Sequence, residues 1–210
     1  MIKLERKDYS KMCASSSNKL AIPSNNSLVS IDPKETGSLN SFAAILFSFL
    51  EELRNKYSQL IILCIGSDRS TGDSLGPLVG SMLADLQLDG IPVYGTLDKP
   101  VHALNIKEIK EYIENNYTSP AILAVDACLG QKHMVGHLEV GKGSLLPGAA
   151  VKKRIPPVGN LFITGIVNVG GFMELMVLQS TRLGVVLPLA RFIGWGIFLA
   201  ASNWAINNKF

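Results

Sequence analysis

The strongest hydrophobic signal in the chain is an apolar run over residues 60–65, followed by a polar loop that contains glycine and then by helical periodicity. A run rich in Leu and Ile predicts a buried strand. The later periodicity predicts a helix over about 73–87, with Pro77 in the first turn, where a missing N–H does no harm. A second apolar run, 121–125, predicts another strand and ends at Asp126. The two segments therefore indicate βα units of one sheet.

The remaining apolar patterns predict alternating helices and strands. Helices are predicted over 41–57, 106–116 and 172–182, and a last helix is predicted to end at about residue 203. Strands are predicted over 91–95, 133–141 and 161–168. This order predicts an α/β fold, with helices on both faces of a mostly parallel or mixed sheet. Residues 39–210 form one domain in this interpretation. The Ser- and Asn-rich residues 1–38 are predicted to be a flexible arm, although the apolar residues 28–31 could cross an edge of the domain.

The C-terminal segment 183–205 is long and apolar enough to resemble a membrane span. Arg191 would then lie near the bilayer centre, at a cost of about 2.5–3.5 kcal/mol. Pro188 and two glycines also interrupt the run. A helix buried against the sheet is therefore the favoured interpretation, and we expect no membrane partner.

Composition narrows the class of protein. The 210 residues are 47% apolar and 18% charged, which is typical of a globular chain with a sizeable core. A net charge of +3 is too small to indicate nucleic acid as a partner. Three cysteines (Cys13, Cys64 and Cys128) form no disulfide framework, so we expect a reduced, cytoplasmic protein. The core positions of Cys64 and Cys128 favour small buried side chains over nucleophiles.

Two carboxylates at strand ends are the main candidates for chemistry. Asp73 follows the first strand and Asp126 ends the second, and the carboxyl ends of strands are where α/β sheets bind ligands. Two acids close together cannot both ionise easily, so they can divide acid and base roles around a water molecule. They could instead hold a divalent metal ion that activates the water. The structural alternatives are a helix-terminal acid for Asp73 and a solvated strand-end acid for Asp126.

Other motifs carry less chemistry. The loop GSDRSTGDSLG lacks the glycine patterns of nucleotide-binding loops, and its acids, Asp68 and Asp73, stand where an anion would bind. His102 follows the strand at 91–95 and could approach the same sheet edge. His133 and His137 would share one face of the strand predicted at 133–141, but no third metal ligand accompanies them. We therefore expect no metal site and no cofactor.

The quoted residues resemble a known group of peptidases. The motifs IGSD (65–68) and GDSLGP (72–77) resemble the first active-site segment of the bacterial spore germination protease and, more distantly, of the hydrogenase maturation endopeptidases. AVDA (124–127) resembles the strand-end segment of the same superfamily. From about residue 40 to the C-terminus, the chain is similar to the YyaC-like sporulation family, described as spore proteases. The resemblance implies an α/β/α sandwich, catalytic Asp73 and Asp126, and small acid-soluble spore proteins as substrates.

The sequence departs from these relatives at three points. Its loop is one residue shorter, and the whole chain is much shorter than the germination protease. No segment matches that protease's processing segment, and the arm at 1–38 is the candidate for one. Where the maturation enzymes use a third metal-sensing residue, a His, this chain has Asn168, a poor ligand for nickel. Asp68 stands where the relatives carry Asn. We assign Asp68, Asn168 and His102 to substrate binding.

Three functions remain open from the sequence. The first is an endopeptidase with an Asp73/Asp126 pair that cleaves small spore proteins, in the cytoplasm or the forespore. The second is a non-catalytic protein that binds a peptide or partner in the same cleft. The third is a hydrolase of small molecules on a related scaffold. The oligomeric state is left open.

Overall fold

The computed structural model describes residues 28–147 and 156–207. The first 27 residues of the predicted arm, including Cys13, lie outside this part of the chain. The helices, 3-10 turns (η) and strands follow one another in this order: β1 (Leu28–Ile31), α2 (Ser38–Arg54), β2 (Gln59–Cys64), η1 (Gly72–Ser74), α3 (Leu75–Leu86), β3 (Val93–Tyr94), α4 (Ile106–Asn116), β4 (Pro120–Gly130), η2 (Lys132–Met134), β5 (Leu138–Lys142), β6 (Leu161–Val169), α5 (Glu174–Gln179) and α6 (Leu183–Asn207).

The strands form one mixed sheet in the order β1-β5-β6-β4-β2-β3. β6, β4, β2 and β3 run parallel, whereas β5 is antiparallel to β6 and β1 is antiparallel to β5. The prediction of an α/β fold with a mixed sheet is confirmed. Leu28–Ile31 forms the edge strand, which is the alternative that the sequence left open for these residues.

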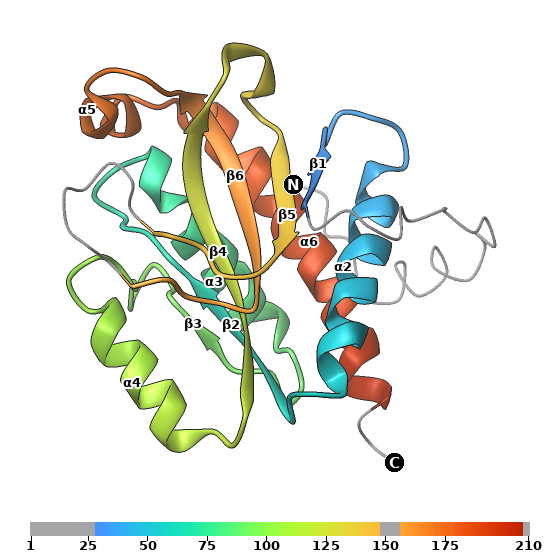
Figure 1. Ribbon diagram of the computed structural model, residues 1–210. Coiled ribbons are helices and arrows are strands. Elements are labelled where there is room, and N and C mark those ends of the chain that lie inside the picture. Colours follow the sequence, from blue (N-terminus) through green and yellow to red (C-terminus); the bar gives the residue numbers. More distant parts are fainter. Residues whose placement is uncertain (1–27, 148–155, 208–210) are drawn as a thin grey trace.

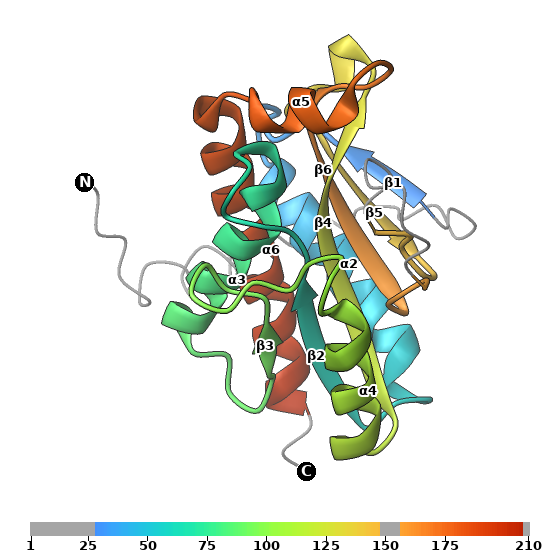
Figure 2. The same ribbon diagram turned by 90° about the vertical axis from the view of Figure 1, so that its left-hand side faces the viewer.

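Helices cover both faces of the sheet, as the α/β/α interpretation requires. Figure 2 shows α3 and α6 on the left of the sheet and α4 on its right. The larger hydrophobic core joins one face to α2, α3 and α6, and a smaller core joins the other face to α4. The alternation along β2 makes this possible, because Ile62 and Cys64 enter the first core while Ile61 and Leu63 enter the second.

The apolar C-terminal segment forms α6 and packs inside the molecule. By length and composition, Leu183–Ser202 could cross a membrane. In the structure α6 contacts α2, α3 and β6, and Arg191 is exposed. The Phe42 and Phe192 rings stack with centroids 5.8 Å apart, and the Arg54 guanidinium lies 4.7 Å from the Trp204 ring centroid. The helix therefore has the contacts expected of a core helix.

Candidate active site

Four of the five predicted site residues lie in or after four neighbouring parallel strands. Asp126 lies in β4, and Asp73 follows β2, whose last residue, Cys64, is opposite Val125. His102 follows Val101, which bridges to Ile65 just beyond β2. Asn168 lies near the end of β6. The parallel pairing therefore brings segments from distant parts of the sequence to one edge of the sheet, above which α5 lies in Figure 1.

Close backbone packing fixes the loop that carries Asp73. The Ser67 N–H donates a hydrogen bond to the Asp73 carbonyl, with N and O 3.1 Å apart. A Cβ atom at Gly66 would lie 2.0 Å from that same carbonyl oxygen. A Cβ atom at Gly76 would lie 2.0 Å from the Ile65 carbonyl oxygen. The two glycines thus let the start of α3 approach the end of β2, and this contact determines where Asp73 lies.

Burial perturbs the Asp73 carboxyl. Desolvation raises its pKa above the ordinary range, because the charged form loses contact with water. The positive charge of His102 and the Ser67 N–H oppose this by lowering the pKa, but burial has the larger effect. Asp73 is therefore easier to protonate than an exposed aspartate, a property expected of a general acid.

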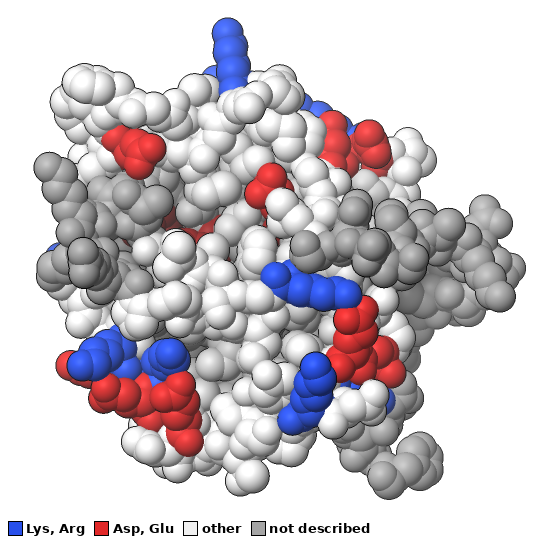
Figure 3. Space-filling view, in the orientation of Figure 1, with Lys and Arg blue, Asp and Glu red and all other residues white. Residues whose placement is uncertain are grey.

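Asp126 is buried within a polar row across the sheet. Its Oδ1 accepts a hydrogen bond from the Ala127 N–H at 2.8 Å, and only 5% of the residue is exposed. Thr164 of β6 is opposite Asp126, Glu139 of β5 is opposite Thr164, and Ser30 of β1 is opposite Glu139. Figure 3 shows acidic atoms recessed in the upper half of this largely uncharged face. The sheet thus offers a polar surface that leads away from Asp126.

Cys128 lies two residues after Asp126 but is not activated. Burial raises the pKa of its thiol, a hydrogen bond with Thr164 lowers it, and the charges of Glu139 and Asp126 raise it, to about 11. Burial also raises the pKa of Cys64. Both thiols are therefore protonated at neutral pH, which makes them poor nucleophiles.

Thiol labelling should show this protection. In a Cys13→Ser background at pH 8, Cys64 and Cys128 should react with a thiol reagent at least about 10²-fold more slowly in the native protein than in denaturant. The reaction can be followed by mass spectrometry of the labelled peptides. Fast native labelling of Cys128 would contradict the burial argument.

The predicted binding residues Asp68 and Asn168 lie at different positions along the strand direction from Asp126. Asp68 is exposed in the turn after β2. Asn168 lies four residues beyond Thr164, about 13 Å further along the strand than Asp126 at ~3.3 Å per residue. Its Nδ2 donates to Thr181 Oγ1 at 3.1 Å, and its Oδ1 accepts from the Val169 N–H at 2.8 Å. The register therefore separates Asn168 from Asp126 along the sheet.

The prediction of a strand over 133–141 was wrong in its first half. His133 lies in η2, and His137 precedes β5, so the two do not alternate along one strand. His137 Nε2 instead lies 3.7 Å from Asp32 Oδ2. Within residues 28–147 and 156–207, no group of three or more His, Cys, Asp or Glu is placed to hold a metal ion.

Sequence reasoning missed a pocket beside the candidate site. A pocket of about 620 Å³ lies between β3 and α4, and its lining includes His102. The other lining residues are ordinary core and loop types, so the sequence signal for the pocket was limited to the position of His102 after a strand. The pocket exists because β3 and α4 pack together, which the sequence pattern alone does not reveal.

Fold and site define an α/β/α protein with one acid, Asp126, buried in a central strand and a second, Asp73, partly buried after the neighbouring strand. The chain belongs to the family described as "Protein of unknown function (DUF1256)", whose model matches residues 31–196. It is 47% identical over 165 residues to the uncharacterized protein YyaC of Bacillus subtilis (strain 168). This match covers 79% of this chain and 80% of YyaC. It is also similar to the crystal structure of the NiFe hydrogenase maturation protease HycI from Thermococcus kodakarensis KOD1, with a TM-score of 0.47 and 16% identity over 72% of this chain and 97% of HycI.

Proposed function

We propose that the protein is an endopeptidase that hydrolyses peptide bonds of small spore proteins with Asp73 and Asp126, in the cytoplasm or the forespore. The resemblance of residues 65–77 and 124–127 to the germination protease segments supports the reaction class and the substrate. The observation that carries the proposal is the environment of Asp73: a partly buried carboxyl of raised pKa, in the turn that follows β2, the strand next to the one that holds buried Asp126. Acids in such environments are typical of catalytic sites.

The proposed reaction divides two roles between the carboxyl groups. Asp126, as a carboxylate, takes a proton from a water molecule whose oxygen attacks the carbonyl carbon of the peptide bond. Asp73, protonated, gives its proton to the amide nitrogen as the carbon–nitrogen bond breaks. The raised pKa of Asp73 suits the role of acid. A divalent metal ion held between the two carboxylates, which would activate the same water, is the variant of this mechanism that chelator treatment tests.

Cleavage of purified small acid-soluble spore proteins tests the proposal. We expect mass spectrometry to show defined fragments with the wild-type chain and none with Asp126→Asn. Asp85→Asn is the matched control, because Asp85 is exposed on α3 and lies outside the site. Circular dichroism should show that all three proteins are folded.

The other outcomes separate the alternatives. Tight binding of the spore proteins without cleavage would replace the peptidase with a non-catalytic binding protein on the same fold. Neither binding nor cleavage of peptides would favour a small-molecule hydrolase. Cleavage that persists in Asp126→Asn would exclude the proposed pair.

A further inference from the structure

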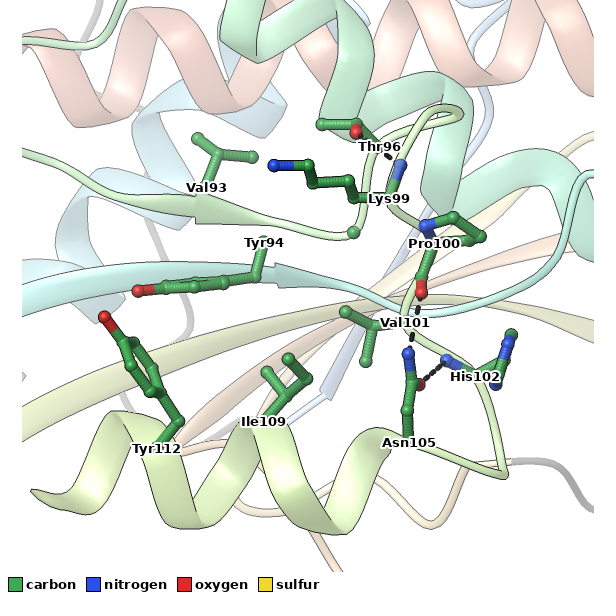
Figure 4. A pocket seen from close by; sticks show the side chains of 11 residues that line it. Val93, Tyr94, Thr96, Lys99, Pro100, Val101, His102, Asn105, Ile109 and Tyr112 are labelled. Atoms are coloured by element: carbon green, nitrogen blue, oxygen red, sulfur yellow. Dashed lines mark hydrogen bonds between the residues drawn. The ribbon is translucent and has the colours of Figure 1, made fainter.

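The pocket between β3 and α4 has an apolar interior. Tyr94, Ile109 and Tyr112 point toward one another in Figure 4. The Tyr94 and Tyr112 rings meet edge to face with centroids 6.2 Å apart, and the Tyr94 hydroxyl is hydrogen-bonded to that of Tyr117 at 2.8 Å. Since this pairing engages the Tyr94 hydroxyl, the pocket offers mainly ring and aliphatic surface. A large apolar side chain of a ligand would match it.

The rim of the pocket is basic. Lys99 and His102 line it, and no acidic residue does. Lys99 Nζ has no acidic partner among the residues that the structure describes. The Asn105 side chain is already occupied, because Oδ1 accepts from the His102 N–H at 2.8 Å and Nδ2 donates to the Pro100 carbonyl at 3.0 Å. The Lys99 ammonium is thus a charged group available at the rim, and a cation favours a carboxylate.

The pocket also lies on an edge of the sheet that no other strand of the described residues covers. β3 is the last strand of the sheet, and the Pro92 carbonyl accepts the Ile62 N–H at 3.0 Å. Because parallel ladders alternate, the Val93 N–H and carbonyl point away from β2. An extended peptide could pair with these groups and add a strand. Successive side chains would then point to opposite sides, one toward Tyr94 and the next toward the side on which Lys99 runs back along Val93 (Figure 4).

We propose that this pocket is the specificity pocket of the site: it binds an extended peptide along β3, with a large apolar side chain against Tyr94 and Tyr112 and a neighbouring carboxylate on Lys99. The link to catalysis rests on the proposed function and on the backbone: the carbonyl of Val101, which lines the pocket, accepts the Gly66 N–H at 2.8 Å, and the next residue, Ser67, donates its N–H to the Asp73 carbonyl at 3.1 Å. The pocket thereby adjoins the segment that carries Asp73.

Peptide binding tests the pocket separately from cleavage. Fluorescein-labelled octapeptides with a central Phe-Asp, Phe-Lys or Ala-Asp pair are titrated against the wild-type chain and Asp126→Asn, with fluorescence anisotropy as the readout. We expect Phe-Asp to bind at least about tenfold more tightly than either of the other peptides. Equal binding of the three peptides, or binding of none of them, would overturn the inference.

Two pairs of exposed variants locate the binding. Tyr112→Ala should weaken Phe-Asp binding by about tenfold, whereas Leu104→Ala, an exposed truncation outside the pocket, should not change it. Lys99→Glu should reverse the preference for Phe-Asp over Phe-Lys, whereas Lys107→Glu, on the exposed side of α4, should preserve it. Controls that weaken binding as much as the pocket variants would place the peptide elsewhere.

The two proposals can fail independently. Selective binding without cleavage of any spore protein would support the proposed peptide-binding pocket and contradict the proposed peptidase function. Cleavage with no selectivity for the central pair would support the proposed peptidase function and contradict the proposed peptide-binding pocket.

Discussion

Asn in place of Asp73 is expected to lower kcat/KM for peptide cleavage by about 10²–10⁴-fold, the usual contribution of a positioned general acid. The same change should raise the free energy of unfolding at pH 7. Burial raises the pKa of Asp73, so its charged form costs stability in the folded chain. Asparagine keeps the size of the side chain and an oxygen acceptor but carries no charge. A loss of activity with a gain in stability is typical of a residue kept for chemistry.

The gain should depend on pH in a defined direction. Because the pKa of Asp73 is higher in the folded chain than in the unfolded chain, the folded state binds the proton more tightly, and stability falls as the pH rises between the two pKa values. The advantage of Asp73→Asn is therefore largest above the folded pKa and disappears below about pH 3.9, the ordinary aspartate pKa. Urea unfolding from pH 4 to pH 8 measures it.

Asp85→Asn serves as the control for both effects. Asp85 lies on α3 and is exposed, so its replacement should leave activity and stability close to those of the wild type at every pH. Full activity in Asp73→Asn would remove the residue from the mechanism. A less stable Asp73→Asn would show that its contacts with His102 and Ser67 outweigh its burial.

Local patterns were sufficient where an element is decided by its own residues. The helix predicted at 106–116 coincides with α4, because Ile106 and Ile113 lie on one buried face while the charges lie outside. The buried run at 60–65 differs by one residue at each end from β2. Both segments carry a pattern that does not depend on a distant partner.

Elements decided by distant partners were harder to predict. β4 was expected to end at Val125 but continues to Gly130, because β6 extends beside it as far as Val169. The prediction for residues 28–31 stayed open because β1 is stabilised by β5, more than a hundred residues later. No period within β1 reveals that pairing.

The candidate site follows the same rule. Asp73 and Asp126 could be chosen from the sequence because each follows an apolar strand, and parallel strands share a carboxyl edge. The position of Asn168 relative to Asp126 depends on the register between β4 and β6, which shifts between Cys128 and Leu129. The pocket depends on the packing of α4 beside β3. Neither property is encoded in a local pattern.

The second large effect is expected at Gly76. Alanine there would place Cβ 2.0 Å from the Ile65 carbonyl oxygen and 2.8 Å from the Ile65 N and C atoms. These are backbone atoms of the residue that directly follows the central strand β2, so no side-chain rotation can relieve the clash, and α3 must move away from β2. We expect Gly76→Ala to lower the free energy of unfolding by about 3 kcal/mol or more. Urea denaturation measures the loss.

Gly184→Ala provides the matched control, because a Cβ atom at Gly184 meets nothing within 4 Å. Its stability should stay within about 1 kcal/mol of the wild type, on the stabilising side, since alanine favours a helix more than glycine does. A folded Gly76→Ala protein should still cleave poorly, because the displaced helix start carries Asp73 with it. Wild-type stability and activity in Gly76→Ala would contradict the close contact of α3 and β2 on which the placement of Asp73 depends.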